Sequence, residues 1–251
     1  MPENTRYHVL RIDEQLYGCE ELPEGQPVLC DVLLEDAAGQ QMTLAVPDAE
    51  LTANDINEGD AVTLCGQKLV RLHPVYFTRH GETVWNVENK ICGMTDSPLT
   101  EKGQAQARAL GQKIKASGIR IDQILYSPLS RAADTAKAIA KATGIPARCE
   151  PRLREQCFGK YEGTPRDGEE FRISKTHFAD RYEGGESMMQ LAQRIYNLLD
   201  ELAADHDKTY LLVAHNGIAR VVQSYFYDMT NEEYSAAGIR NCEFVEFVFN
   251  K

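Results

Sequence analysis

An apolar, β-prone run at residues 75–78 leads directly into Arg79, His80 and Gly81, and this junction constrains the chain more than any other feature. A strand that ends on such a pair holds two reactive side chains at the edge of a sheet, and the glycine lets the backbone turn and approach a ligand closely. A guanidinium offers a rigid fork to phosphate oxygens, and an imidazole can act as a base or a nucleophile. The tripeptide alone fits a surface histidine at a strand end equally well, so its meaning depends on the rest of the chain.

From His73 onward, short apolar runs alternate with helical patterns, which is typical of an α/β fold. The patterns predict strands at 75–79, 122–127, 210–214 and 244–249, and helices at 100–117, 130–143, 187–204 and from 218 onward. The strand at 210–214 is almost wholly apolar, as a central parallel strand should be, whereas the last strand has the character of an edge strand.

Three of the predicted strands end in residues that suit chemistry on an anion. Strand 75–79 leads into His80, strand 122–127 is followed by Arg131, and strand 210–214 is followed by His215. Ligands bind outside the carboxyl ends of parallel strands, so we expect two histidines and two arginines to converge at one edge of the sheet. Three strand ends of one chemical character are hard to explain by coincidence.

Six segments around these residues give the chain a wider resemblance. They are Arg79-His80-Gly81-Glu82-Thr83 with Trp85-Asn86; Gly93 with Asp96-Ser97-Pro98-Leu99-Thr100 and Gly103; Ser127-Pro128-Leu129 with Arg131-Ala132 and Thr135-Ala136; Leu153-Arg154-Glu155 with Phe158-Gly159 and Glu162-Gly163; Gly184-Gly185-Glu186-Ser187 with Arg194; and Val213-Ala214-His215-Asn216-Gly217. In this order and spacing the segments resemble the histidine phosphatase superfamily, also called the phosphoglycerate mutase-like family. The resemblance covers nearly all of residues 73–251 and implies a catalytic domain there, folded as a three-layer α/β/α sandwich with a mostly parallel sheet.

The resemblance also implies a role for each site residue. His80 would be the catalytic nucleophile that carries the phosphoryl group, and the neighbouring Arg79 and Arg131 should lower its pKa so that the ring is neutral. Glu155 would give a proton to the leaving oxygen. The phosphate would be bound by four side chains: Arg79, Asn86, Arg131 and His215. Of these, Arg79 and His215 would also count among the catalytic residues, with His80 and Glu155.

Some of these residues also fit structural roles. Asn86 could cap a helix or a turn. Glu162 lies in the same segment as Glu155, but it matches a structural turn residue of the family, so Glu155 is preferred as the proton donor. Three further side chains are expected to be structural: Glu82, Glu186 and Arg194.

The sequence predicts no metal and no cofactor. Two arginines and a histidine already supply donors to a phosphate, and the chain has neither clustered carboxylates nor a His-x-Glu-x-x-His pattern. The seven cysteines are scattered and are never spaced as Cys-x-x-Cys, so neither a disulfide framework nor a zinc site is indicated.

Residues 1–72 lie outside the resemblance and indicate a small all-β domain of unknown role, either barrel-like or a folded sheet. Five β-prone runs separated by turn residues predict it, at 7–12, 28–34, 42–47, 61–65 and 68–72. This part carries 14 acidic and 4 basic residues, which is −10 of the chain's net charge of −11. The excess of acid argues against nucleic acid or an anionic membrane as a partner. Ligand binding, packing on the catalytic domain and formation of a homo-oligomer stay open as its role.

The segment between Gly163 and Gly184 decides which branch of the family the chain resembles. It is short and holds four basic and five acidic residues, which predicts a pocket without net positive charge. Phosphoglycerate mutases carry a longer insertion here, with additional basic residues for a second anionic group. The compact phosphatase branch is therefore favoured.

The predicted function is a phosphomonoester hydrolase that acts on a small phosphorylated metabolite through a phosphohistidine. Its chemistry would be metal-independent, like that of a histidine acid phosphatase. A 2,3-bisphosphoglycerate-dependent phosphoglycerate mutase and a non-catalytic phosphate-binding scaffold are the alternatives. No apolar run is long enough to span a membrane, so a cytoplasmic location is expected.

Overall fold

The computed structural model describes residues 5–15, 26–66 and 68–249. The chain forms two compact units. One comprises Met1–His73 together with Ser117–Arg120, and the other comprises Pro74–Ala116 together with Ile121–Lys251. The six described cysteines are free, and Cys19 lies outside the described residues.

The first unit is built on an antiparallel sheet with the strand order β3-β2-β1-β4-β5. Its strands are β1 Arg6–Glu14, β2 Leu29–Asp36, β3 Gln41–Pro47, β4 Ala61–Cys65 and β5 Lys68–Arg71. Apolar residues that alternate along the strands make its core, with Val9, Val32 and Leu34 almost completely buried.

Two parts of the prediction for this unit, the all-β content and the barrel alternative, are wrong. A helix, α1 (Asp48–Ala53), follows β3 directly. Pro47 lacks the N–H that would continue a strand, Asp48 and Glu50 suit the first turn of a helix, and Leu51 packs into the core. The sheet is also open among the described strands, because β3 and β5 lie at its two edges.

The second unit holds a five-stranded sheet with the order β10-β6-β9-β7-β8. Its strands are β6 His73–Arg79, β7 Gln123–Tyr126, β8 Ala147–Cys149, β9 Tyr210–Ala214 and β10 Phe244–Phe249. The pairs β6–β9, β9–β7 and β7–β8 are parallel, so the carboxyl ends of these strands share one edge of the sheet. The fully buried strand β9 lies at the centre and β10 at an edge, as their patterns predicted.

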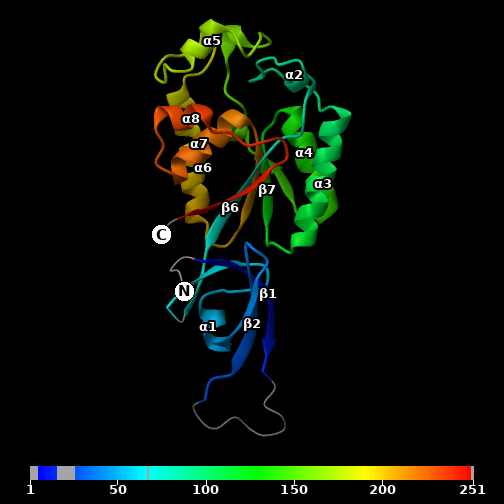
Figure 1. Ribbon diagram of the computed structural model, residues 1–251, viewed down its shortest axis with the longest axis vertical. Coiled ribbons are helices and arrows are strands. Elements are labelled where there is room, and N and C mark those ends of the chain that lie inside the picture. Colours follow the sequence, from blue (N-terminus) through cyan, green and yellow to red (C-terminus); the bar gives the residue numbers. More distant parts are fainter. Residues whose placement is uncertain (1–4, 16–25, 67, 250–251) are drawn as a thin grey trace. The chain divides into compact units, whose positions relative to one another are not determined.

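Helices lie on both sides of this sheet. Figure 1 shows α3 (Glu101–Ser117) and α4 (Ser130–Thr143) on one side, and α6 (Met188–Ala204) and α7 (Asn216–Phe226) on the other. The apolar face of α6 packs with α7 and the strands in one core cluster. Short elements complete the unit: α2 Val84–Val87, α5 Glu169–Ser174, α8 Asn231–Ala236, and the 3₁₀ turns Pro151–Leu153 and Gly159–Tyr161. No helix among the described residues is long and apolar enough to cross a membrane.

Candidate active site

Three chemically active segments meet where the parallel strands end. The backbone N–H of His80, just after β6, donates to the carbonyl of Ala214 at the end of β9, at 3.0 Å. The N–H of Ser127, just after β7, donates to Val213 at 3.1 Å. The rings of His80 and His215 lie side by side, with centroids 5.2 Å apart. The predicted convergence of strand ends is therefore present.

His80 is held as a neutral imidazole with one nitrogen free. Its Nδ1 lies 2.7 Å from the carbonyl oxygen of Gly81, which can only accept, so we assign the ring proton to Nδ1. The Nε2 atom then keeps its lone pair. Burial lowers the pKa of His80 well below its ordinary value, and the charges of Arg131 and Arg79 lower it further. The sequence predicted the effect of the two arginines, but burial is the larger cause.

Gly81 is needed for close packing, and not for the sharp turn that the sequence suggested. Its φ is not positive, and a Cβ built on it would overlap the backbone of Gly103 in α3. The loop after His80 therefore lies directly against α3. Glu82 fixes the same contact, because its carboxylate accepts from Thr100 at 3.0 Å and from Lys102 at 2.8 Å.

Arg131, at the start of α4, is 1% exposed, and the loop at residues 92–97 fixes its guanidinium. Its Nη1 donates to the carbonyl of Thr95 at 3.1 Å and to the carboxylate of Asp96 at 3.3 Å, and its Nη2 donates to the carbonyl of Gly93 at 2.7 Å. Three of the five N–H bonds are thus used. The Nε–H and one N–H of Nη2 are left, and this pair forms the side of a guanidinium that binds an oxyanion in bidentate fashion.

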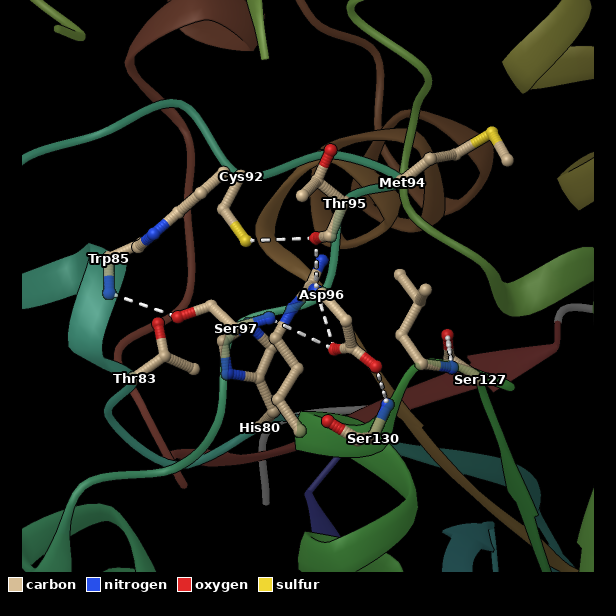
Figure 2. Close-up of polar contacts among 12 residues, drawn as sticks. His80, Thr83, Trp85, Cys92, Met94, Thr95, Asp96, Ser97, Ser127 and Ser130 are labelled. Carbon is tan, nitrogen blue, oxygen red and sulfur yellow. Dashed lines mark hydrogen bonds and ion pairs between the residues drawn. The ribbon is translucent and has the colours of Figure 1, made fainter. Parts of the chain in front are cut away.

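Asp96 ties this loop to α4. Figure 2 shows its carboxylate reaching the backbone N–H of Ser130 at 2.7 Å, while the N–H of Ser97 donates to its other oxygen at 3.1 Å. The Cys92 thiol donates to the carbonyl of Thr95 at 3.3 Å in the same view. The loop whose carbonyls accept from Arg131 is therefore fixed by the contact of Cys92 on one side and by those of Asp96 on the other.

Arg79 and His215 add two further buried donors. The Nη1 of Arg79 donates to the carbonyl of Ile239 at 3.3 Å, and burial lowers its pKa to about 10, with a smaller contribution from Arg166. The Nε2 of His215 lies 2.7 Å from the hydroxyl of Ser127, which already accepts from the N–H of Leu129. We assign this hydroxyl as the donor to Nε2, which places the ring proton of His215 on Nδ1.

Three buried N–H groups near His80 thus have no partner among the described residues: Nε of Arg79, Nε of Arg131 and Nδ1 of His215. An unpaired buried donor costs roughly 1–3 kcal/mol, so three in one place indicate a site that an anion completes.

Asn86 has the capping role that the sequence left open, and its role in binding phosphate stays a prediction. It is the third residue of a capping box at the start of α2, where its Oδ1 accepts from the N–H of Thr83 at 3.2 Å. The same Oδ1 accepts from Nδ2 of Asn241 at 3.4 Å. Both contacts use the oxygen of the side chain, so the amide nitrogen keeps its two N–H donors, and Asn86 lines the same cavity as His80.

Asn241 is a positioning residue that sequence reasoning missed. Besides Asn86, its Nδ2 contacts the carbonyl of His80 at 2.8 Å, and its backbone bridges to that of Arg79. It lies 161 residues beyond His80 in the chain, and no local pattern marks it.

Glu155 is 5% exposed and is anchored by backbone N–H groups. Its two carboxylate oxygens accept from Gln156 at 2.9 Å and from Gly217 at 3.0 Å. A Cβ on Gly217 would overlap this carboxylate, so the glycine at the start of α7 is required for its position. The loop that carries Glu155 is held by Arg194, which donates to the carbonyl of Glu155 at 3.5 Å and forms a two-pronged ion pair with Glu186 at 2.9 and 3.0 Å.

Glu162 is structural, as the sequence predicted. Its carboxylate accepts from the backbone N–H groups of Gly93, Met94, Thr95 and Phe158 at 3.0 to 3.1 Å. It therefore joins the loop that grips Arg131 to the segment that follows Glu155.

A cavity of about 460 Å³ opens onto this arrangement. Four of the six predicted site residues line it: Arg79, His80, Asn86 and Glu155. Arg131 and His215 are almost completely buried next to His80. The structure thus brings all six together.

The cavity wall contradicts the expectation of a pocket without net positive charge. Arg166, Arg172 and Lys175 of the segment 163–184 line it, and so does Arg220 of α7. None of the five acids of that segment does. Counting charges along the segment missed this because the basic and acidic side chains point to different places.

No three His, Cys, Asp or Glu side chains within residues 5–15, 26–66 and 68–249 are grouped so as to hold a metal ion. Metal independence stays a prediction.

Comparison with known proteins places this geometry in a family. Residues 75–251 match the model of the histidine phosphatase superfamily (branch 1). "Probable phosphoglycerate mutase GpmB" of Yersinia pestis (strain Pestoides F) is 36% identical over 176 residues, which cover 67% of this chain and 81% of the relative.

Two solved structures are also similar. A mycobacterial glucosyl-3-phosphoglycerate phosphatase is 28% identical with a TM-score of 0.61, covering 70% of this chain and 90% of its own. A phosphoglycerate mutase from Thermus thermophilus is 28% identical with a TM-score of 0.56, and the match covers 70% of this chain and 96% of the mutase chain. The chain carrying this site belongs to the histidine phosphatase superfamily.

Proposed function

We propose that this protein is a phosphomonoester hydrolase that works through a phosphohistidine at His80. The observation that carries the proposal is a neutral imidazole with a free Nε2, beside three buried N–H groups without partners among the described residues. A nucleophile next to an unfilled oxyanion cradle suits phosphoryl transfer, where catalysis is mostly positioning and electrostatic stabilisation.

In the first step Nε2 of His80 attacks the phosphorus atom in line with the bond to the leaving oxygen. The new N–P bond forms as the P–O bond breaks, and Glu155 gives its proton to the leaving oxygen. The imidazole becomes positively charged, and its Nδ1–H bond to the carbonyl of Gly81 stabilises that charge. The side chains of Arg79 and Arg131 stabilise the charge on the equatorial oxygens.

In the second step water attacks the phosphohistidine. Glu155, now a carboxylate, accepts the proton from water while the N–P bond breaks and its electron pair returns to Nε2. Inorganic phosphate leaves, and Glu155 is protonated again for the next cycle. Protein side chains provide every group in this scheme, so activity is expected to survive chelators.

Hydrolysis of para-nitrophenyl phosphate in the presence of a chelator tests the proposal. We expect turnover by the wild type, loss by at least about 10³-fold in His80→Asn, and no loss in the control His177→Asn, whose ring is exposed and paired with Asp180. An active His80→Asn enzyme contradicts the nucleophile, and dependence on a divalent ion contradicts the metal-free scheme. Phosphate binding without turnover would favour the scaffold.

A phosphoglycerate mutase is a second candidate, and the cationic cavity wall favours it. One of the similar proteins is named a probable phosphoglycerate mutase, and another is named a phosphatase. Incubation of 3-phosphoglycerate with and without 2,3-bisphosphoglycerate separates the two: isomerisation that outpaces phosphate release would replace the hydrolase by the mutase. We further propose a cytoplasmic location and a small phosphorylated substrate, and assign residues 1–72 no part in the chemistry.

A further inference from the structure

Four cationic side chains line the cavity in addition to the groups around His80. They come from separate segments: Arg166 from the loop after Gly163, Arg172 and Lys175 from the end of α5, and Arg220 from α7. The transferred phosphoryl group does not need them, because Arg79 and Arg131 already match the two negative charges of a phosphate.

None of the ion pairs within the described part of the chain includes these four residues. Neighbouring acids are engaged elsewhere. Glu170 pairs with Lys160 at 2.8 Å, and Asp180 pairs with His177 at 3.2 Å. The single carboxylate that lines the cavity belongs to Glu155. The positive charge on this wall is therefore not balanced by the described residues.

Two of the arginines are anchored so that their outer ends stay free. The Nε of Arg220 donates to the carbonyl of Ala237 at 2.8 Å, and the Nε of Arg166 donates to the carbonyl of Lys90 at 2.8 Å. No described group accepts from their terminal nitrogens. Such guanidinium ends suit an oxyanion.

Lys175 shows that these charges repel one another. Its Nζ lies 4.8 Å from the centre of the Phe171 ring. Burial lowers its pKa, and the charges of Arg220 and Arg166 lower it further. The same two arginines lower the pKa of Arg79. Like charges gathered in a partly buried place are relieved by a bound anion.

We propose that Arg166, Arg172, Lys175 and Arg220 form a subsite for a second oxyanion of the same substrate. This rests on the proposed function of His80 and makes the substrate a phosphomonoester that also carries a carboxylate or a second phosphate. Ile91, Phe158 and Phe171 line the same cavity and provide an apolar surface for the carbon skeleton that joins the two groups.

The test compares substrates that differ only in the second charge. The matched pairs are 3-phosphoglycerate with glycerol 3-phosphate, and 4-carboxyphenyl phosphate with phenyl phosphate; glycerol 1,3-bisphosphate distinguishes a phosphate from a carboxylate preference. For the wild type we expect kcat/KM to favour the member with the second anion by about 10- to 100-fold in at least one pair, as a hydrogen bond to a charged group provides.

Arg220→Gln and Lys175→Gln should each reduce that ratio about tenfold or more, because each removes one charged donor. These two positions are chosen because neither is among the charges that chiefly shift the pKa of His80, whereas Arg166 is. Arg108→Gln is the matched control, since it removes an exposed charge on α3 and should leave the ratio unchanged.

The subsite and the hydrolase can fail separately. Hydrolysis of both members of every pair at equal kcat/KM, or a ratio that survives both substitutions, overturns the subsite and leaves the hydrolase in place. Failure of the wild type to hydrolyse any of the five esters overturns the proposed function itself, and the subsite with it.

Discussion

Gly217→Ala should remove proton donation by Glu155 without touching the glutamate itself. The added Cβ would overlap the Glu155 carboxylate, and the N–H of Gly217 is one of its two anchors. The helix does not oppose the change, because alanine is favoured over glycine in a helix by about 0.5–1 kcal/mol. Glu155 must therefore move away from the place where it meets the leaving oxygen.

The size of the effect should depend on the leaving group. A positioned general acid contributes about 10²- to 10⁴-fold, and a displaced one loses most of this contribution, so we expect kcat/KM for glycerol 3-phosphate to fall at least about 10²-fold. The phenol of para-nitrophenyl phosphate leaves without a proton, so its kcat/KM should fall less than about tenfold. The comparison uses kcat/KM because this constant reports the transfer to His80, whereas kcat also includes the attack of water, in which Glu155 is the base for both substrates.

Steady-state kinetics on both substrates, with thermal unfolding as a check of folding, measures this difference. Gly168→Ala is the matched control, because its Cβ would lie at an ordinary 3.5 Å from the nearest atom. Equal losses of kcat/KM on the two substrates would refute the assignment of Glu155 as the acid. So would an unchanged glycerol 3-phosphate activity in a folded variant.

Three further predictions concern the residues around the nucleophile. Burial lowers the pKa of both His80 and His215, so the unfolded chain takes up protons before the folded chain does as the pH falls. The free energy of unfolding should therefore decrease below about pH 6.5, by up to about 1.4 kcal/mol per pH unit for each histidine. Urea unfolding at pH 7.5, 6.5 and 5.5 should show that the free energy of unfolding depends less steeply on pH in His80→Asn than in the wild type. Asn241→Ala should lower kcat/KM roughly tenfold, because it removes the contact that holds the Asn86 amide. The double variant Asn241→Ala/Asn86→Ala should lose less activity than the product of the two single losses. Full additivity would show that Asn241 does not act through Asn86. Glu162→Gln replaces one accepting oxygen with an NH2 group that faces backbone N–H donors, so it should lower the free energy of unfolding in urea by about 1–3 kcal/mol, while the exposed Glu183→Gln should change it almost not at all. Equal stabilities of the two variants would contradict the role of Glu162 in joining its two loops.

The sequence was sufficient for the parts of the site that follow strands. His80, Arg131 and His215 come after apolar runs, and the parallel pairing of β6, β9 and β7 brings such positions together whatever the details of the loops. Helix α4 and strand β9 have the predicted bounds, because Gly144 ends the helix in a left-handed conformation and Tyr210–Ala214 is apolar throughout.

Short elements and contacts between distant segments could not be predicted. Helices α1 and α5 have six residues each, too few for a helical period to be recognised. Asn241 reaches the site through its bridge to Arg79, just before β10, and Arg220 reaches it through α7, so their roles depend on tertiary structure. The cationic wall was missed because composition does not record which side chains of a loop face inward.

The stereochemical course at phosphorus tests the central claim most directly. A phosphomonoester whose phosphorus is made chiral by a sulfur atom and oxygen isotopes is hydrolysed in isotope-labelled water, and the configuration of the product is determined by phosphorus NMR. Two in-line transfers, first to His80 and then to water, invert the centre twice and predict net retention. Net inversion would mean that water attacks the ester directly, and His80 would then not be the nucleophile.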